Sequence, residues 1–379
     1  MAGKLIDEIL IKNKNSDIKV ISLIGLAKNA GKTVAFNQLV SELAHEGYQL
    51  GLVSFGRDGE EIDAVTNKEK PGITIPSGTY FVTAENVKAD LNTEFQVYKT
   101  TDISTTLGRV NIYKNTGFFN KEIELAGVNR ISNLEKIKKF LAEKVEYLIV
   151  DGALDRKSSS LPGLSDKTIL ATGAVLAPDI AGVIDKTSLA VKKLLLPRVQ
   201  SDEERDIYQK LISQHQSKNK ELPGGWLVEV ESRDGDSNPE IKNLIELKSN
   251  SSLGISRELD KKLKKISTDQ TTSKTLVLSG ALTDSLGQKL SEDHRCRNFK
   301  VVIQDGTRVF LRKRYLGLLK RNQVKIEVLK EINLAAITVN PHNPEGRDLD
   351  SKEIREELKS LFPEIPIYDV KSTDYYSKK

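Results

Sequence analysis

Two glycines, a lysine and a threonine form a compact group near the amino end of the chain, in the stretch Gly25-Leu-Ala-Lys-Asn-Ala-Gly-Lys-Thr33. Backbone N–H groups in such a glycine-bounded loop can converge on a phosphate. Lys32 would supply a cation for the β- and γ-phosphates of a nucleotide, and the Thr33 hydroxyl could bind Mg²⁺. The stretch therefore predicts a phosphate-binding loop. We expect nucleotide contacts from Gly25, Lys28, Asn29, Ala30, Gly31, Lys32, Thr33 and Val34.

The segments on either side of this loop have the patterns that such a site requires. Residues 20–24 are almost all apolar, which is typical of a buried strand. After the loop, Val34, Leu39, Val40 and Leu43 recur at helical spacing. We therefore expect a strand, the loop and a helix in this order, with the helix amino terminus facing the bound anion.

Acidic residues follow two further predicted strands. The apolar segment 146–151 ends in Asp151, which we expect to join the Mg²⁺ coordination shell, and Asp155 follows in a predicted switch loop. Asp58 follows the apolar segment 47–56, where it could hold Mg²⁺, orient water, or simply belong to a polar turn. The candidate catalytic residues are Lys32, Asp58, Asp151 and Asp155, and the candidate metal ligands are Thr33, Asp58 and Asp151.

The composition excludes several classes of protein. Hydrophobic residues make up 38% of the 379 residues and charged residues 29%, which is typical of a globular protein. The net charge of +5 is too small to predict a nucleic-acid partner. The single cysteine, Cys296, excludes an internal disulfide, and the histidines lack metal-ligand spacing, so Mg²⁺ is the only metal implied. With no apolar run near the ~18 residues of a membrane span and no signal peptide, we expect a cytoplasmic protein.

Periodicity along the chain predicts an α/β fold with a mostly parallel sheet of the P-loop NTPase type. We expect a nucleotide-binding domain over residues 1–200, with a β-rich insertion at about 70–116. Residues 201–273 are predicted to form a charged helical connector, and residues 274–379 a smaller C-terminal α/β domain. The strands predicted in the insertion and the C-terminal domain are Tyr80–Thr83, Phe95–Lys99, Arg109–Tyr113, Thr275–Ser279, Lys300–Gln304, Ile326–Leu329, Ala335–Val339 and Ile365–Val370.

Two C-terminal segments have less specific patterns. Residues 308–321 are rich in arginine and lysine and are predicted to be helical from Val309 to Lys320, either as a solvated face or as a surface for an acidic partner. Residues 340–346, Asn-Pro-His-Asn-Pro-Glu-Gly, form a predicted strand-end loop that could line a site.

Several of these motifs together resemble one family, the P-loop subunit of the lysine 5,6-aminomutase reactivase. The segment after Asp151 is the most specific, because a generic ATPase does not need Ala-Leu-Asp-Arg-Lys-Ser-Ser at this place. The spacing between Gly25 and Gly31, one residue wider than the standard pattern, also resembles dethiobiotin synthetase. The matching segments are residues 25–33, 56–60, 124–127, 149–159, 171–175 and 279–284.

The resemblance implies a chaperone-like ATPase that uses ATP and Mg²⁺. Its client would be an adenosylcobalamin-dependent aminomutase of lysine fermentation, from which it helps expel damaged cobalamin. Its partner would be a second subunit similar to mismatch-repair ATPases, and a homodimer stays an alternative. GTP in place of ATP also stays open, because no base-contacting motif stands out. The alternatives are an ATP-dependent synthetase acting on a small carboxylate, like dethiobiotin synthetase, and a nucleotide-binding regulator without turnover.

Overall fold

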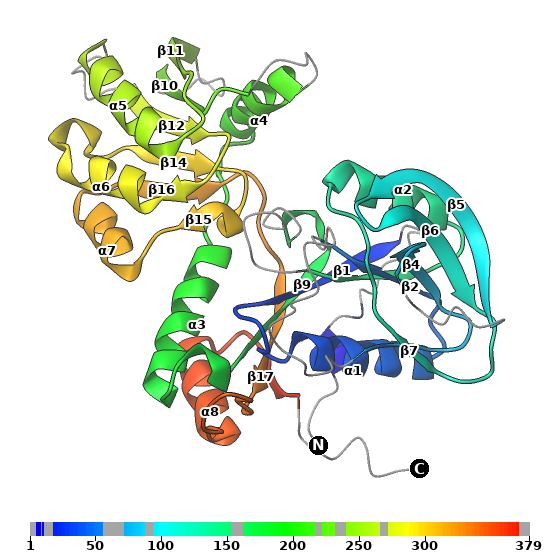
Figure 1. Ribbon diagram of the computed structural model, residues 1–379. Coiled ribbons are helices and arrows are strands. Elements are labelled where there is room, and N and C mark those ends of the chain that lie inside the picture. Colours follow the sequence, from blue (N-terminus) through cyan, green and yellow to red (C-terminus); the bar gives the residue numbers. More distant parts are fainter. Residues whose placement is uncertain are drawn as a thin grey trace. The chain divides into compact units, whose positions relative to one another are not determined.

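The computed structural model describes residues 5–8, 10, 18–55, 72–87, 94–152, 162–216, 222–231, 240–265 and 272–370 (Figure 1). The chain divides into two compact units. The first combines Met1–Ala190 with Asn333–Lys379, and the second comprises Val191–Ile332. The second unit is therefore inserted into the first, and the last part of the chain returns to the first unit.

A sheet of nine strands forms the centre of the first unit. In spatial order its strands are β18 (Ile367–Asp369), β17 (Leu334–Asn340), β9 (Lys167–Gly173), β1 (Lys19–Gly25), β8 (Tyr147–Asp151), β2 (Leu50–Ser54), β4 (Tyr80–Ala84), β6 (Gly108–Asn115) and β5 (Phe95–Thr105). Neighbouring strands from β18 to β4 are parallel, whereas β6 and β5 are antiparallel. The mixed, mostly parallel sheet confirms the predicted α/β class.

Helices cover both faces of this sheet, which is why its central strands are apolar along their whole length. Helix α1 (Lys32–His45) packs with Ile149 of β8 on one face, and α2 (Ile131–Leu141) packs with Leu148 and Val150 on the other (Figure 1). Helix α8 (Ser351–Leu361) packs on β17 and β18. Helix α3 (Ile180–Leu194) is linked to β9 by a 2.6 Å hydrogen bond between the Thr172 and Thr187 hydroxyls.

The predicted β-rich insertion proves to be an extension of the main sheet. Its three predicted strands lie where β4, β5 and β6 begin, and β4 pairs in parallel with β2. Strands β5 and β6 are joined by a tight turn and form an antiparallel hairpin at the edge of the sheet. A small antiparallel pair, β3 (Ile73–Ile75) with β7 (Lys121–Ile123), lies nearby in the sequence.

The second unit contains a five-stranded sheet with helices on both faces. Its strands, in spatial order, are β11 (Glu240–Leu247), β10 (Gly225–Glu231), β12 (Thr272–Leu278), β14 (Lys300–Ile303) and β16 (Lys325–Val328). The last three are parallel, and β10 is antiparallel to both of its neighbours. Its helices are α4 (Asp202–Gln216) on one face, and α5 (Ser252–Lys262), α6 (Asp284–Glu292) and α7 (Lys313–Arg321) on the other.

The remaining elements are short. Strands β13 (Leu282–Thr283) and β15 (Val309–Phe310) form a short parallel pair. Short 3₁₀ helices lie at Leu5–Glu8, Pro162–Leu164, Ala174–Leu176, Leu263–Lys265, His294–Cys296 and Gly306–Arg308. In the part of the chain that the structure describes, no helix has both the length and the apolar character needed to cross a membrane.

The division into units corrects the predicted domain boundaries. Residues 201–273 do not form a connector, because α4, β10, β11 and α5 belong to the sheet and helices of the second unit. Residues 333–379 do not belong to a C-terminal domain, because β17 pairs with β9 of the first sheet. The predicted strands at 335–339 and 365–370 are correct as strands but were assigned to the wrong unit. Periodicity indicates a buried strand without indicating its neighbour.

The helix predicted from Val309 begins only at Lys313, because Val309 and Phe310 form β15.

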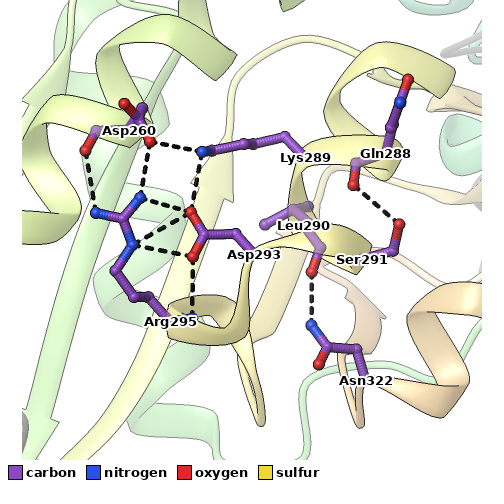
Figure 2. Close-up of polar contacts among 8 residues, drawn as sticks. All are labelled: Asp260, Gln288, Lys289, Leu290, Ser291, Asp293, Arg295 and Asn322. Carbon is purple, nitrogen blue, oxygen red and sulfur yellow. Dashed lines mark hydrogen bonds and ion pairs between the residues drawn. The ribbon is translucent and has the colours of Figure 1, made fainter.

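A network of charged side chains ties α5 to α6 in the second unit (Figure 2). Arg295 Nη2 lies 2.7 Å from both Asp293 Oδ2 and Asp260 Oδ1. Lys289 Nζ contacts the same two carboxylates, at 2.9 Å and 2.6 Å. The hydrogen bonds from Arg295 hold the pKa of Asp293 well below its usual range. Each carboxylate therefore shares two cations, which favours the charged form.

We predict that Asp293→Asn destabilises the protein near neutral pH by about 1–2 kcal/mol, since charge-assisted hydrogen bonds are lost. The folded pKa of Asp293 lies below its unfolded value of about 3.8, so its carboxylate stabilises above that value. This contribution is lost as the pH falls through the folded pKa. Urea titrations from about pH 5 to about pH 2 should show the difference between parent and variant shrinking.

Ser291→Ala provides a control for this prediction. Ser291 lies near the end of α6, two residues before Asp293, and its hydroxyl donates to the Gln288 carbonyl outside the charged network (Figure 2). Its effect on the free energy of unfolding should not depend on pH. A pH-independent loss in Asp293→Asn would contradict the proposed role of the network.

Candidate functional site

The carboxyl ends of the central parallel strands bring the predicted site residues to one edge of the sheet. Leu23 of β1 is in register with Asp151 of β8, and Gly25 with Ala171 of β9. After β1 the chain continues to β2 on one side, whereas after β8 it continues to β9 on the other. Open parallel sheets bind ligands at such a reversal, outside the carboxyl ends of the strands.

The loop between β1 and α1 has a backbone that presents N–H groups to this edge. Asn29 and Gly31 both adopt left-handed conformations, with φ values of 63° and 88°. Gly31 directly precedes the first residue of α1, and no side chain caps the helix. The first N–H groups of a helix have no partner within the helix, so they can bind an anion.

Lys32 and Asp151 form an ion pair at the start of α1. Lys32 Nζ lies 2.8 Å from Asp151 Oδ1 and donates a 2.6 Å hydrogen bond to the Gly152 carbonyl. The Asp151 contact is close but lacks the alignment of a hydrogen bond. The Asp151 side chain is only 4% exposed. A buried carboxylate is costly without a cation, and Lys32 supplies one.

The end of β17 supports the loop from the side, a contact that sequence reasoning missed. Asn340 donates from Nδ2 to the Asn29 carbonyl at 3.1 Å. A Cβ atom on Gly31 would lie 2.7 Å from the Asn340 Cβ and 3.3 Å from Val370 Cγ2. The sequence predicted that the loop beginning at Asn340 could line a site, but it assigned that loop to another domain. The signal in the sequence for this contact was an apolar strand that ends in a polar residue, Asn340.

The same C-terminal loop carries a histidine held by a carboxylate. His342 Nδ1 lies 2.9 Å from Asp348 Oδ1, which also accepts a hydrogen bond from the Asn343 backbone. The His342 side chain is 45% exposed. The carboxylate therefore fixes the orientation of this ring. The spacing of the histidines in the sequence gave no indication of this pair.

The structure brings together most, but not all, of the predicted site residues. Lys28 and Asn29 are exposed on the loop, Ala30 and Gly31 are buried, and Thr33 lies in the first turn of α1. Asp58 and Asp155 lie outside the described residues. The predicted residues that lie at or next to this edge of the sheet are Gly25, Lys28, Asn29, Ala30, Gly31, Lys32, Thr33, Val34 and Asp151.

Few side chains at this edge of the sheet could serve as ligands for magnesium. Among the described residues, no group of three or more His, Cys, Asp or Glu side chains is placed to hold a metal ion. The predicted ligands here are one hydroxyl, from Thr33, and one carboxylate, from Asp151. Mg²⁺ takes oxygen ligands, keeps several waters and is usually completed by substrate phosphates, so this donor set is sufficient.

Comparisons of the chain with protein-family models and with curated proteins give no match. The resemblance to the reactivase subunit therefore depends on the motifs quoted above. The geometry adds an independent physical observation: a helix amino terminus, a lysine and a buried aspartate lie at one edge of a parallel sheet.

We predict that Gly31→Ala destabilises the protein by about 2–5 kcal/mol. The left-handed conformation costs a non-glycine residue about 1–2 kcal/mol, and overlap with Asn340 adds about 1–3 kcal/mol. Chemical denaturation of both proteins at neutral pH measures the difference in the free energy of unfolding.

Gly47→Ala is the matched control for Gly31→Ala. Gly47 has nearly the same conformation, with φ of 86°, but no atom lies within 4 Å of the position of an added Cβ. Only the backbone cost applies there, so we expect a loss of about 1–2 kcal/mol. Equal losses at the two glycines would show that Asn340 does not restrict the loop.

Proposed function

We propose that the chain binds a nucleoside triphosphate with Mg²⁺ at the β1–α1 loop. The observation that carries this proposal is the ion pair between Lys32 and the buried Asp151 beside an uncapped helix amino terminus. A cation, free N–H groups and an oxygen ligand for Mg²⁺ are the three components that a triphosphate site requires. An ion pair with a purely structural role would need only the cation and the carboxylate oxygen, and not the free N–H groups.

Each residue of the site has a proposed role. Gly31 and the following N–H groups bind phosphate oxygens, with Lys32 as the cation, and Thr33 and Asp151 hold Mg²⁺. The bound nucleotide supplies a γ-phosphate whose presence or absence distinguishes two states. We assign sensing of that phosphate to Asp58 and Asp155, which follow β2 and β8 in the sequence.

Lys32 also offers a way to transmit nucleotide binding to the rest of the protein. Its Nζ holds the Gly152 carbonyl, while the Gly152 N–H donates to the Leu23 carbonyl at 2.9 Å. When Lys32 turns to a phosphate, Gly152 keeps its link to β1 and loses its link to Lys32. Nucleotide binding would then be coupled to the contacts of Gly152, and a nucleotide shifts such an equilibrium only if it binds the two states unequally.

We further propose that the energy of nucleotide binding is used to remodel a protein client. The resemblance makes this client an adenosylcobalamin-dependent aminomutase and adds a second reactivase subunit as partner. An exposed aromatic pair supports a protein client: Phe118 is 95% exposed and Phe119 is 72% exposed. They follow β6, and backbone and side-chain hydrogen bonds from Thr116 to the Glu94 carbonyl hold the segment in place. Large exposed apolar groups are typical of binding surfaces. A small carboxylate substrate would not need them.

We predict that the protein binds ATP in a Mg²⁺-dependent manner and that Lys32→Ala weakens this binding roughly 30-fold or more. The loss corresponds to about 2 kcal/mol, the contribution of a charge-assisted hydrogen bond. Calorimetric titration measures the dissociation constants, with GTP as competitor. Asp151→Asn should reduce the gain in affinity that Mg²⁺ gives.

Lys139→Ala is the control, because this lysine is exposed on α2 and contributes to no part of the site. The proposal fails if the parent protein binds no nucleotide at millimolar concentration with Mg²⁺. It also fails if Lys32→Ala binds as tightly as Lys139→Ala.

We predict that the double variant Phe118→Ser, Phe119→Ser keeps its affinity for nucleotide but loses recovery of an inactivated client. The assay mixes the protein, its partner subunit, ATP and Mg²⁺ with cobalamin-inactivated aminomutase and measures recovered activity. Because both rings are exposed, their loss should not lower the melting temperature. Full recovery of activity by the variant would exclude this aromatic pair from client binding.

A further inference from the structure

The second unit contains an open cavity of about 700 Å³. It lies at the amino edge of the parallel strands β12, β14 and β16, since Lys300 and Lys325 are the first residues of β14 and β16. The carboxyl edge of a parallel sheet is the usual place for a ligand. Here the cavity lies at the amino edge instead. Its positive charge comes from lysine side chains and not from helix amino termini.

Apolar side chains form one part of the cavity. Leu316 and Leu319 come from α7, and Ile326 comes from β16. Leu319 belongs to the apolar core of the unit, and Leu316 and Ile326 pack against that core while staying partly exposed. A ring or a short chain could therefore bury its surface here without rearranging the core.

Lysines form the other part of the cavity, and most of them lack a described counter-ion. Lys300 is neutralised by Glu204 at 2.6 Å and Glu327 at 3.5 Å. For Lys274, Lys320 and Lys325, no carboxylate of the described residues lies within ion-pair distance, 4.0 Å. These three lysines come from separate elements, so their grouping is a property of the fold.

A purely structural explanation covers only part of this grouping. Lys320 lies in the last turn of α7, where a cation interacts favourably with the negative end of the helix. That explanation does not apply to Lys274 on β12 or to Lys325 on β16. Lys325 is in register with Lys300, but the two carboxylates that pair with Lys300 are not within ion-pair distance of Lys325. An anion in the cavity would stabilise the arrangement.

We propose that this cavity binds a small organic anion, in which a carboxylate or phosphate group is joined to an apolar ring or chain. The anionic group contacts Lys274, Lys320 and Lys325, and the apolar part lies against Leu316, Leu319 and Ile326. The volume falls within the range of small-molecule sites, about 300–1,000 Å³. Asn322, next to the cavity, donates to the Leu290 carbonyl at 2.8 Å, so the turn after α7 is fixed to α6 (Figure 2). The proposal does not depend on the nucleotide site of the first unit.

The test uses the full chain and two probes that share the same ring, 2-naphthyl phosphate and uncharged 2-naphthol, measured by calorimetry. We expect the phosphate to bind at least tenfold more tightly than the naphthol. The double variant Lys320→Gln, Lys325→Gln should lower the affinity for the phosphate at least tenfold and leave the naphthol unchanged. The loss caused by the double variant should persist when it is combined with Lys32→Ala, which separates this site from the β1–α1 loop.

Two controls decide the outcome. Lys264→Gln removes an exposed lysine of the same unit that does not line the cavity, and it should have no effect. Inorganic phosphate should bind at least tenfold more weakly than 2-naphthyl phosphate, since it has no apolar part. Equal binding of the two naphthyl probes, an unchanged double variant, an equal loss in Lys264→Gln, or equally tight inorganic phosphate would each overturn the proposal.

Discussion

The burial of the central parallel strands on both faces is the constraint on which the candidate site depends. Strand β8 is buried along its whole length, and β1 is buried at every position except its ends. Polar side chains within these strands must pair with each other, as the Ser22 and Thr168 hydroxyls do at 3.0 Å. Polar groups that need a partner from outside the sheet are best accommodated where the strands end. The edge of the sheet is therefore where Asp151, Gly25 and Asn340 all lie.

The ion pair of Lys32 and Asp151 follows from this constraint. Asp151 is the last residue of a buried strand, so its carboxylate is almost withdrawn from water and requires a cation. The first residue of α1 supplies that cation, and the same lysine reaches the Gly152 carbonyl. The candidate site thus contains charges that neutralise each other without a ligand. When a ligand binds, Lys32 can exchange the Asp151 carboxylate for the anion of the ligand. This exchange costs less than leaving a buried charge without a partner.

The sequence was sufficient for the parts of the site that depend on local patterns. The apolar run before Gly25, the helical spacing after Lys32 and the aspartate at the end of a strand are all short-range signals, and the structure places them as predicted. The contribution of Asn340 could not be predicted, because pairing between strands far apart in the sequence, here β17 with β9, leaves no trace in periodicity. The contacts of the basic segment 308–321 could not be predicted from local patterns either. Arg308 donates to the Ser279 carbonyl, Arg312 pairs with Asp284, and only part of α7 lines the cavity.

The order of the strands has a consequence for the synthesis of the protein. Strand β9 emerges from the ribosome before residues 191–332, whereas its neighbour β17 emerges after them. A nascent chain that ends before Leu334 therefore carries β9 with one unpaired edge, which is open to the wrong partners. The strands of the inserted unit are contiguous in the sequence, so this unit has all its residues available earlier. Strand β17, translated after the inserted unit, both pairs with β9 and places Asn340 against the loop.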